Sequence, residues 1–180
     1  MKFNIPKLNI AKPHIPKPNI MNSDLGKINL KSLAVSLVIS LGAGILSVFL
    51  TGGSMRQYAD MYQPSLAPPG WVFPIVWTIL YILMGIAAWR IYEARGCDKR
   101  LAFSLYGNQL LLNIVWPLLF FNLSLYFFAC AWLLLLWLII YLTMRQFLLI
   151  DQKAGLLLIP YLAWVTFAGY LNLAIAIHYL

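Results

Sequence analysis

Five long apolar stretches alternate with polar links along this chain of 180 residues. Each stretch holds about 20 residues, the length at which an α-helix crosses roughly 30 Å of bilayer hydrocarbon. A helix also satisfies its backbone hydrogen bonds internally, as hydrocarbon requires. We therefore predict an all-α integral membrane protein, a bundle of five transmembrane helices. The predicted spans are 33–50, 72–92, 101–121, 125–147 and 154–177.

Two segments lie outside these spans, a basic N-terminal tail and one long loop. Residues 1–31 contain six lysines and four prolines, and proline interrupts helices. We expect a disordered cytoplasmic tail that lies near anionic headgroups, with a partner-binding arm as the alternative. Residues 32–180 then form the transmembrane domain, in which the loop 51–71 is an extended, turned lid on the extracytoplasmic side. The residues that favour turns in the lid are Pro64, Pro68, Pro69 and Gly70.

Basic residues gather on one side of the predicted topology. The chain has 13 lysine and arginine residues against 5 acidic ones. With the N-terminus in the cytoplasm, twelve basic residues are cytoplasmic and Arg56 alone is external. This positive-inside asymmetry predicts a multi-pass protein with a cytoplasmic N-terminus, in the plasma (inner) membrane if the source is bacterial. Because the charges lie in the tail and links and line no apolar span, no nucleic-acid partner is predicted.

The composition narrows the chemistry that the spans can perform. The chain is 62% hydrophobic and 10% charged, whereas soluble domains hold about 25% charged residues. No Asp, Glu, Lys or His lies deep in any span, which argues against an ion-driven pump. There is no phosphate-binding loop, metal-ligand cluster or Ser-His-Asp pattern, so we predict no metal and no cofactor.

One face of the first span is made of small residues. They recur at helical spacing, which predicts a face where a neighbouring helix backbone approaches closely. We therefore expect this face to point into the bundle. Its members are Ser36, Ser40, Ala43 and Ser47.

Three other spans each carry a stripe of aromatic and amide residues. Amide residues also join helices, and tryptophan and tyrosine also form belts at the membrane interface. For any single residue of these stripes, such a structural role is the alternative to ligand binding. At a helical rise of ~1.5 Å per residue, the three stripes overlap at depths of about 8–20 Å below the outer surface. This depth lies directly beneath the lid. The overlap predicts a lidded cavity for a flat, largely apolar ligand. The stripes are Pro74, Trp77, Tyr81 and Ala88; Gln109, Asn113, Trp116 and Phe120; and Tyr161, Trp164, Ala168 and Asn172.

The lid and the stripes also carry recognisable sequence blocks. Residues 64–77 read PSLAPPGWVFPIVW and follow Tyr58; the third span adds Gln109, Asn113 and Trp116, and residues 160–164 read PYLAW. In order and spacing these blocks resemble the translocator protein (TspO/MBR) family, the tryptophan-rich sensory proteins or peripheral benzodiazepine receptors. The resemblance extends from about Tyr58 to the end of the chain.

The resemblance implies a fold, ligands and a set of site residues. It implies a five-helix bundle, usually a homodimer, that binds porphyrins, haem and benzodiazepine-like ligands. Trp77 and Trp164 match two tryptophans that are linked in some members to light-dependent porphyrin breakdown. The candidate ligand-binding residues are Tyr58, Pro68, Pro69, Phe73, Trp77, Tyr81, Gln109, Asn113, Trp116, Tyr161, Trp164, Ala168 and Asn172.

This chain departs from the family pattern mainly in the lid. Gln57 and Leu66 stand where the family commonly has tryptophan, Gln63 where it has lysine, and Pro117 where it has serine. A lysine can pair with a porphyrin propionate, whereas glutamine offers a neutral hydrogen bond. We therefore predict that this protein prefers neutral flat ligands over free-acid porphyrins more than its relatives do.

Three functions fit these observations. The first is a membrane receptor or carrier for a tetrapyrrole-like ligand, with a transport or stress-regulatory role. The second is an enzyme in which Trp77 and Trp164 assist light-dependent porphyrin breakdown. The third is a structural or regulatory membrane protein without a dedicated small ligand. Ligand-induced stabilisation and light-dependent loss of porphyrin absorbance discriminate among them.

Overall fold

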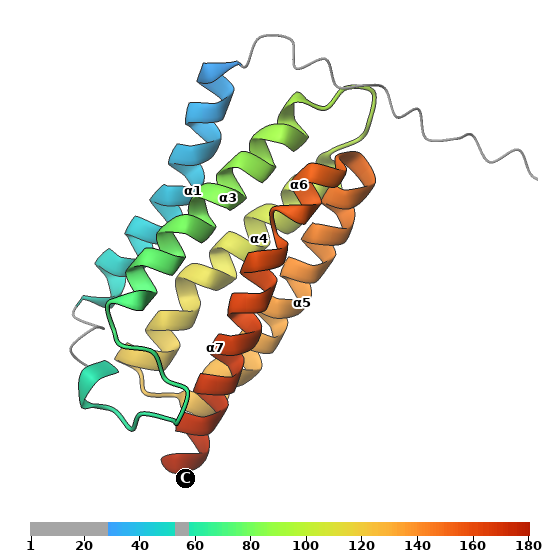
Figure 1. The fold of residues 1–180 in the computed structure, drawn as a ribbon. Helices are drawn as coiled ribbons and strands as arrows, with labels where there is room; N and C mark the ends of the chain where they lie inside the picture. Colours follow the sequence, from blue (N-terminus) through green and yellow to red (C-terminus); the bar gives the residue numbers. More distant parts are fainter. Residues whose placement is uncertain (1–28, 53–57) are drawn as a thin grey trace, which may run out of the picture.

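The computed structural model describes residues 29–52 and 58–180, and the regular structure within them is helical (Figure 1). Five of its spans are long and apolar enough to cross a membrane. The prediction of an all-α, five-span membrane protein is confirmed. Expectations for residues 1–28, Arg56 and Gln57 concern positions outside the described residues. The elements are α1 (Leu30–Thr51), α3 (Val72–Glu93), α4 (Arg100–Pro117), a π-helical turn (Leu118–Asn122), α5 (Tyr126–Ile150), α6 (Gln152–Leu156) and α7 (Ile159–His178).

The third span changes helix type near its end. Proline has no N–H, so Pro117 cannot donate to the carbonyl of Asn113 as a regular helix would require. The chain continues as a π-helical turn, closed by the N–H of Leu123 on the carbonyl of Leu118 at 3.0 Å. Pro117, where the resemblance implies serine, therefore coincides with a change of backbone geometry directly after Asn113 and Trp116.

The fifth span is two helices, where the sequence predicts one continuous helix over 154–177. Asp151 caps α6, its carboxylate accepting the N–H of Ala154 at 2.9 Å. The chain turns at residues 157–158, and α7 then begins with Pro160 in its first turn. Proline is well tolerated there, because the first N–H groups of a helix have no partner within it.

The long helices form a ring in which four neighbouring pairs pack closely: α3 with α1, α1 with α4, α4 with α5, and α5 with α7. The remaining side of the ring is the seam between α3 and α7. The described backbones of these two helices stay farther apart there, and α3 contacts α6 instead. Figure 1 shows α6 and the start of α1 at one end of the bundle. The lid and the C-terminus lie at the other, which we call the lid end.

The predicted small-residue face of α1 packs against α3. Ser40, Ala43 and Ser47 are buried, and the Ser40 hydroxyl donates to the carbonyl of Tyr81 at 2.6 Å. Gly44 continues this face, and a Cβ there would overlap the Tyr81 ring. Close approach of α1 therefore fixes the backbone that carries Tyr81, one of the candidate ligand-binding residues.

Candidate functional site

The lid folds back on itself and on the start of α3. Tyr58 is only 6% exposed, and its hydroxyl donates to the carbonyl of Pro68 at 3.1 Å. Its ring meets Phe73 edge-on, with centroids 4.8 Å apart. Burial raises the pKa of the Tyr58 phenol, so this group remains a neutral donor. These contacts border a lid hollow of about 330 Å³, lined by Tyr58, Ala59, Gln63, Ala67, Pro68, Pro69 and Gly70.

Gln63 and Leu66, the two described lid positions at which the resemblance implies other residues, occupy different surroundings. Gln63 borders the lid hollow, and its side-chain nitrogen donates to the carbonyl of Tyr58. Leu66 is 65% exposed and does not line the hollow. A cation in place of Gln63 would therefore lie at the hollow itself, whereas a tryptophan in place of Leu66 would lie on the outer surface of the lid.

Aromatic rings continue from the lid across the seam. Phe73 of α3 meets Trp164 of α7 edge-on at 5.8 Å. One turn further along α3, Trp77 lies 5.8 Å from Tyr81 and 6.1 Å from Tyr161. Ring pairs at these separations attract each other beyond simple area burial. We call these two neighbouring sets of rings together the aromatic cluster: Tyr58, Phe73 and Trp164 in one, and Trp77, Tyr81 and Tyr161 in the other.

Asn113 joins three helices beneath the aromatic cluster. The hydroxyl of Tyr81 donates to Oδ1 of Asn113 at 3.0 Å, and Nδ2 of Asn113 donates to the hydroxyl of Tyr161 at 2.7 Å. All three side chains are buried. Because each buried polar group has a partner, this amide bridge holds α3, α4 and α7 in one arrangement.

Trp116 and Asn172 form a separate polar contact. Nε1 of Trp116 donates to Oδ1 of Asn172 at 3.1 Å, and Nδ2 of Asn172 donates to the carbonyl of Tyr126 at 2.9 Å. The Trp116 ring stacks on Phe120 at 5.4 Å. The structure thus brings Trp116 and Asn172 together, but on the α4–α5–α7 side and not with Trp77 and Trp164.

The remaining candidates are less engaged with the cluster. Gln109, one turn before Asn113, is 1% exposed, and its nitrogen reaches only the sulfur of Met84 at 3.7 Å. Its carbonyl oxygen has no hydrogen-bond partner among the described residues. Ala168 is buried on α7, one turn beyond Trp164, and Pro69 is exposed at the rim of the lid hollow.

Trp164 differs from three other indoles of the bundle in its hydrogen bonding. Its Nε1 is buried and has no hydrogen-bond partner among the described residues. The indoles of Trp116, Trp132 and Trp137 all donate, at 2.8–3.1 Å. A buried N–H without an acceptor costs free energy, and an acceptor on a bound ligand would recover it. Trp164 is therefore the residue of the cluster best prepared to contact a ligand.

This arrangement supports the binding of an uncharged ligand. The candidate residues offer ring faces, phenols, amides and one buried indole N–H that has no partner among the described residues, and none is a carboxylate, amine or imidazole. Within residues 29–52 and 58–180, no group of three or more His, Cys, Asp or Glu side chains could hold a metal ion. A flat ligand with a few acceptor atoms is the best match to this inventory.

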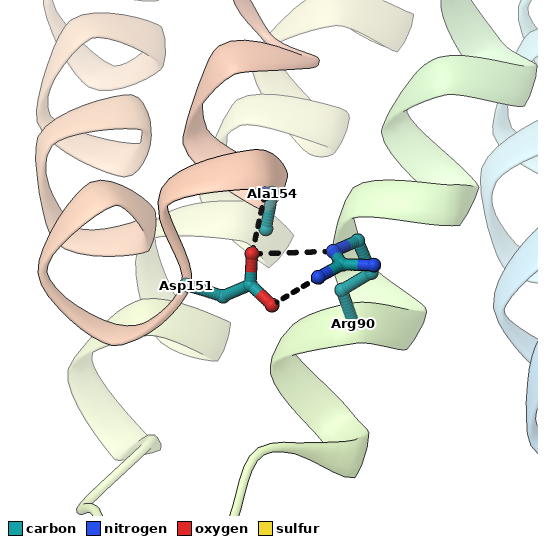
Figure 2. Close-up of polar contacts among 3 residues, drawn as sticks. All are labelled: Arg90, Asp151 and Ala154. Carbon is teal, nitrogen blue, oxygen red and sulfur yellow. Dashed lines mark hydrogen bonds and ion pairs between the residues drawn. The ribbon is translucent and has the colours of Figure 1, made fainter. Parts of the chain in front are cut away.

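The seam carries a charged contact that the sequence analysis missed, because it counted Arg90 only as a topology signal. Figure 2 shows Arg90 of α3 facing Asp151, with its nitrogens 3.2 and 2.6 Å from the two carboxylate oxygens. Burial alone would raise the pKa of Asp151, but the bonds and charge of Arg90 and the N–H of Ala154 outweigh it and lower that pKa. Asp151 is the one acidic residue between the fourth and fifth predicted spans, a signal that could have found this pair.

Comparison with known proteins places these features in a family. The TspO/MBR family model matches residues 34–178. The chain is 37% identical to the tryptophan-rich protein TspO of Chlorobaculum tepidum, over 80% of this chain and 92% of that protein. It is 41% identical to a tryptophan-rich sensory protein of Cereibacter sphaeroides, over 64% and 72%. It is 35% identical to the translocator protein of Homo sapiens, over 78% and 85%. With its five apolar spans, its lid and the tryptophans at its seam, the chain belongs to the TspO/MBR family.

Proposed function

We propose that this protein is a membrane receptor or carrier that binds a flat, largely apolar ligand of the tetrapyrrole class. The proposed site lies between the lid, α3 and α7, above the amide bridge. The observation that carries the proposal is Trp164, whose free indole N–H lies within a cluster of neutral aromatic rings. Relatives named translocator protein and tryptophan-rich sensory protein support a role in transport or in sensing, and the regulatory role that we propose is a response to stress.

The proposed membrane orientation places the N-terminus in the cytoplasm and the lid outside it. Every described lysine and arginine belongs to the α6 end of the bundle or the links next to it, and none belongs to the described lid (Figure 1). This distribution follows the positive-inside rule. Reporter fusions after Tyr92 and after Lys153 should be cytoplasmic and one near Ser65 external. A cytoplasmic Ser65 would overturn the orientation. In a bacterial cell the membrane would be the plasma membrane.

The proposed assembly is a homodimer, as the family resemblance implies. Apolar side chains such as Val38 and Phe49 are 70% and 82% exposed on the outer face of α1, where lipid or a second copy can cover them. Measuring the mass of protein-loaded lipid nanodiscs gives the number of protein copies in each disc. Two copies per disc indicate a dimer, and one copy indicates a monomer.

Ligand binding is tested by thermal stabilisation of the detergent-solubilised protein. Protoporphyrin IX, haem, a bilin and a benzodiazepine-type ligand are added separately, because a ligand that binds only the folded state raises the unfolding temperature. We expect at least one of them to stabilise the protein, and Trp164→Ala to reduce that effect. The matched control is Trp137→Ala, which removes an indole that donates to Thr166 away from the cluster. Failure of every ligand would favour the purely structural role.

An enzymatic role is the second candidate, favoured by the position of two tryptophans. Trp77 and Trp164 both belong to the aromatic cluster and would border a bound porphyrin from opposite sides of the seam. If the protein degrades porphyrin, absorbance should fall only in light and oxygen, and Trp77→Phe should slow the loss. Equal loss in the wild type and in Trp77→Phe would remove this candidate.

A further inference from the structure

The lid closes the site toward water along its described residues. The backbone N–H of Tyr62 donates to the hydroxyl of Tyr179 at 3.2 Å, and the Tyr62 ring stacks on His178 at 3.9 Å. With the bond from Tyr58 to Pro68, these contacts tie the lid to the end of α7 and to itself. A ligand that arrives from water would have to break several of these contacts at once.

The membrane side of the same site is hollowed instead. A groove of about 490 Å³ runs along the α3–α7 seam, where the two backbones stay apart. Its walls carry no charged or amide side chain, so its surface matches hydrocarbon and not water. The residues that line this seam groove are Val76, Ile79, Leu80, Pro160, Ala163, Trp164 and Phe167.

Trp164 belongs both to the seam groove and to the aromatic cluster. It lines the groove, and its ring also meets Phe73 at 5.8 Å. Leu80, the most deeply buried lining residue at 2% exposed, directly precedes Tyr81 of the amide bridge. Because Nε1 of Trp164 has no partner among the described residues, only ring packing holds its indole. The indole can therefore turn without breaking a hydrogen bond, unlike those of Trp132 and Trp137.

We propose that the seam groove is a membrane-side entrance through which a flat, neutral, apolar molecule dissolved in the bilayer enters the aromatic cluster. The groove is continuous with the surface that this membrane-spanning bundle presents to lipid, so its occupant comes from the hydrocarbon. The Trp164 ring is the movable wall between groove and cluster, and its N–H meets an acceptor of the ligand after passage. This inference rests on the proposed function, because it supplies the route to that site.

The experiment measures binding rates in lipid nanodiscs with protoporphyrin IX dimethyl ester, a flat porphyrin without free carboxylates. Tryptophan-fluorescence quenching reports association and dissociation. Ala163 lines the groove, is exposed and takes no part in the aromatic cluster. Ala163→Phe should slow both rates about tenfold and leave the dissociation constant within twofold, because a narrowed entrance raises the barrier in both directions. The matched control, Ala131→Phe, adds the same ring at an exposed position of α5 outside the groove and should change neither rate.

A second variant keeps the test decisive if Ala163→Phe does not fold. Ile79 lines the groove on the α3 side and is 52% exposed, so Ile79→Ala should widen the entrance and raise both rates severalfold. Wild-type rates in both variants, or a changed affinity with unchanged association, would overturn the inference. If the wild type does not bind the diester at all, the proposed function fails together with the route. Binding with unaltered rates defeats the route alone.

Discussion

The α3–α7 seam is held together by different chemistry at its two ends. At the α6 end, Arg90 and Asp151 form a two-bonded ion pair with side chains only 14% and 18% exposed. At the lid end, α3 and α7 meet through rings such as Phe73 and Trp164. An ion pair of fixed geometry resists separation, whereas ring contacts can be exchanged for contacts with a flat ligand. The comparison indicates one fastened end and one end that can admit a ligand.

This difference matters because the same helix carries both ends. Tyr81 lies midway along α3, between the ion pair and the lid, and is held by Ser40 from α1 and by Asn113 from α4. If the lid end opened, α3 would bend or tilt between Tyr81 and the lid, while its half next to α6 stayed in place. The following predictions break each end in turn, from the largest expected effect to the smallest.

Removing the arginine of the ion pair should have the largest effect on stability. Arg90→Ala leaves the partly buried Asp151 without its cation, and breaking fully buried pairs costs roughly 3–5 kcal/mol. Because both groups keep some solvent contact, we expect a loss of about 2–3 kcal/mol, below that range. Thermal unfolding in detergent measures the change, with Arg95→Ala in the neighbouring link as control. Equal unfolding temperatures for the two variants would show that the pair does not fasten this end.

Removing the free indole of the cluster should act on binding and not on the α6 end. Trp164→Ala is expected to weaken binding of a flat ligand by about 1–3 kcal/mol, the usual worth of an aromatic contact surface. Fluorescence-quenching titration gives the dissociation constant, and Trp137→Ala again serves as the control. An unaltered constant in a folded Trp164→Ala protein would assign this residue to packing alone.

Acid should loosen the fastened end before the lid end. The pKa of Asp151 is lower in the folded protein than in the unfolded chain, where an aspartic acid titrates near 3.9. The pair therefore contributes its full stability above that unfolded value and loses it as pH falls through the folded one. We expect Asp151→Asn to flatten the decline of unfolding temperature at acidic pH, relative to the wild type. Parallel pH curves for the two proteins would contradict this assignment.

The sequence predicted the five spans because they depend on local pattern. About 20 apolar residues between polar links can hardly fold otherwise in a bilayer. Helical spacing also put Gln109, Asn113 and Trp116 on one face, and all three are buried. The small-residue face of α1 was predicted for the same reason, and Ser40 and Ala43 are buried there.

Pairings between distant segments could not be read from the same patterns. Nothing in the periodicity says that Arg90 reaches Asp151, 61 residues away, or that Trp116 turns to Asn172 and leaves Trp77 to Tyr161. Nor does it say which seam of the ring stays open. These features depend on how the helices are ordered and tilted, which depends on contacts that span the whole chain.

The smallest predicted effect concerns charge at the lid hollow. The sequence analysis considers Gln63 and Leu66 together, but in the structure they lie in different surroundings. Gln63 borders the hollow, while Leu66 is 65% exposed outside it. Gln63→Lys should therefore raise affinity for free-acid protoporphyrin IX about two- to fivefold, since an exposed ion pair is worth roughly 0.2–1 kcal/mol. The same variant should leave affinity for the neutral dimethyl ester unchanged, and added salt should erode the gain. Leu66→Trp is the companion variant and should favour neither ligand. The test is titration of both porphyrins by fluorescence quenching at low and high salt. An equal gain for acid and ester in Gln63→Lys would show that the hollow does not distinguish charge.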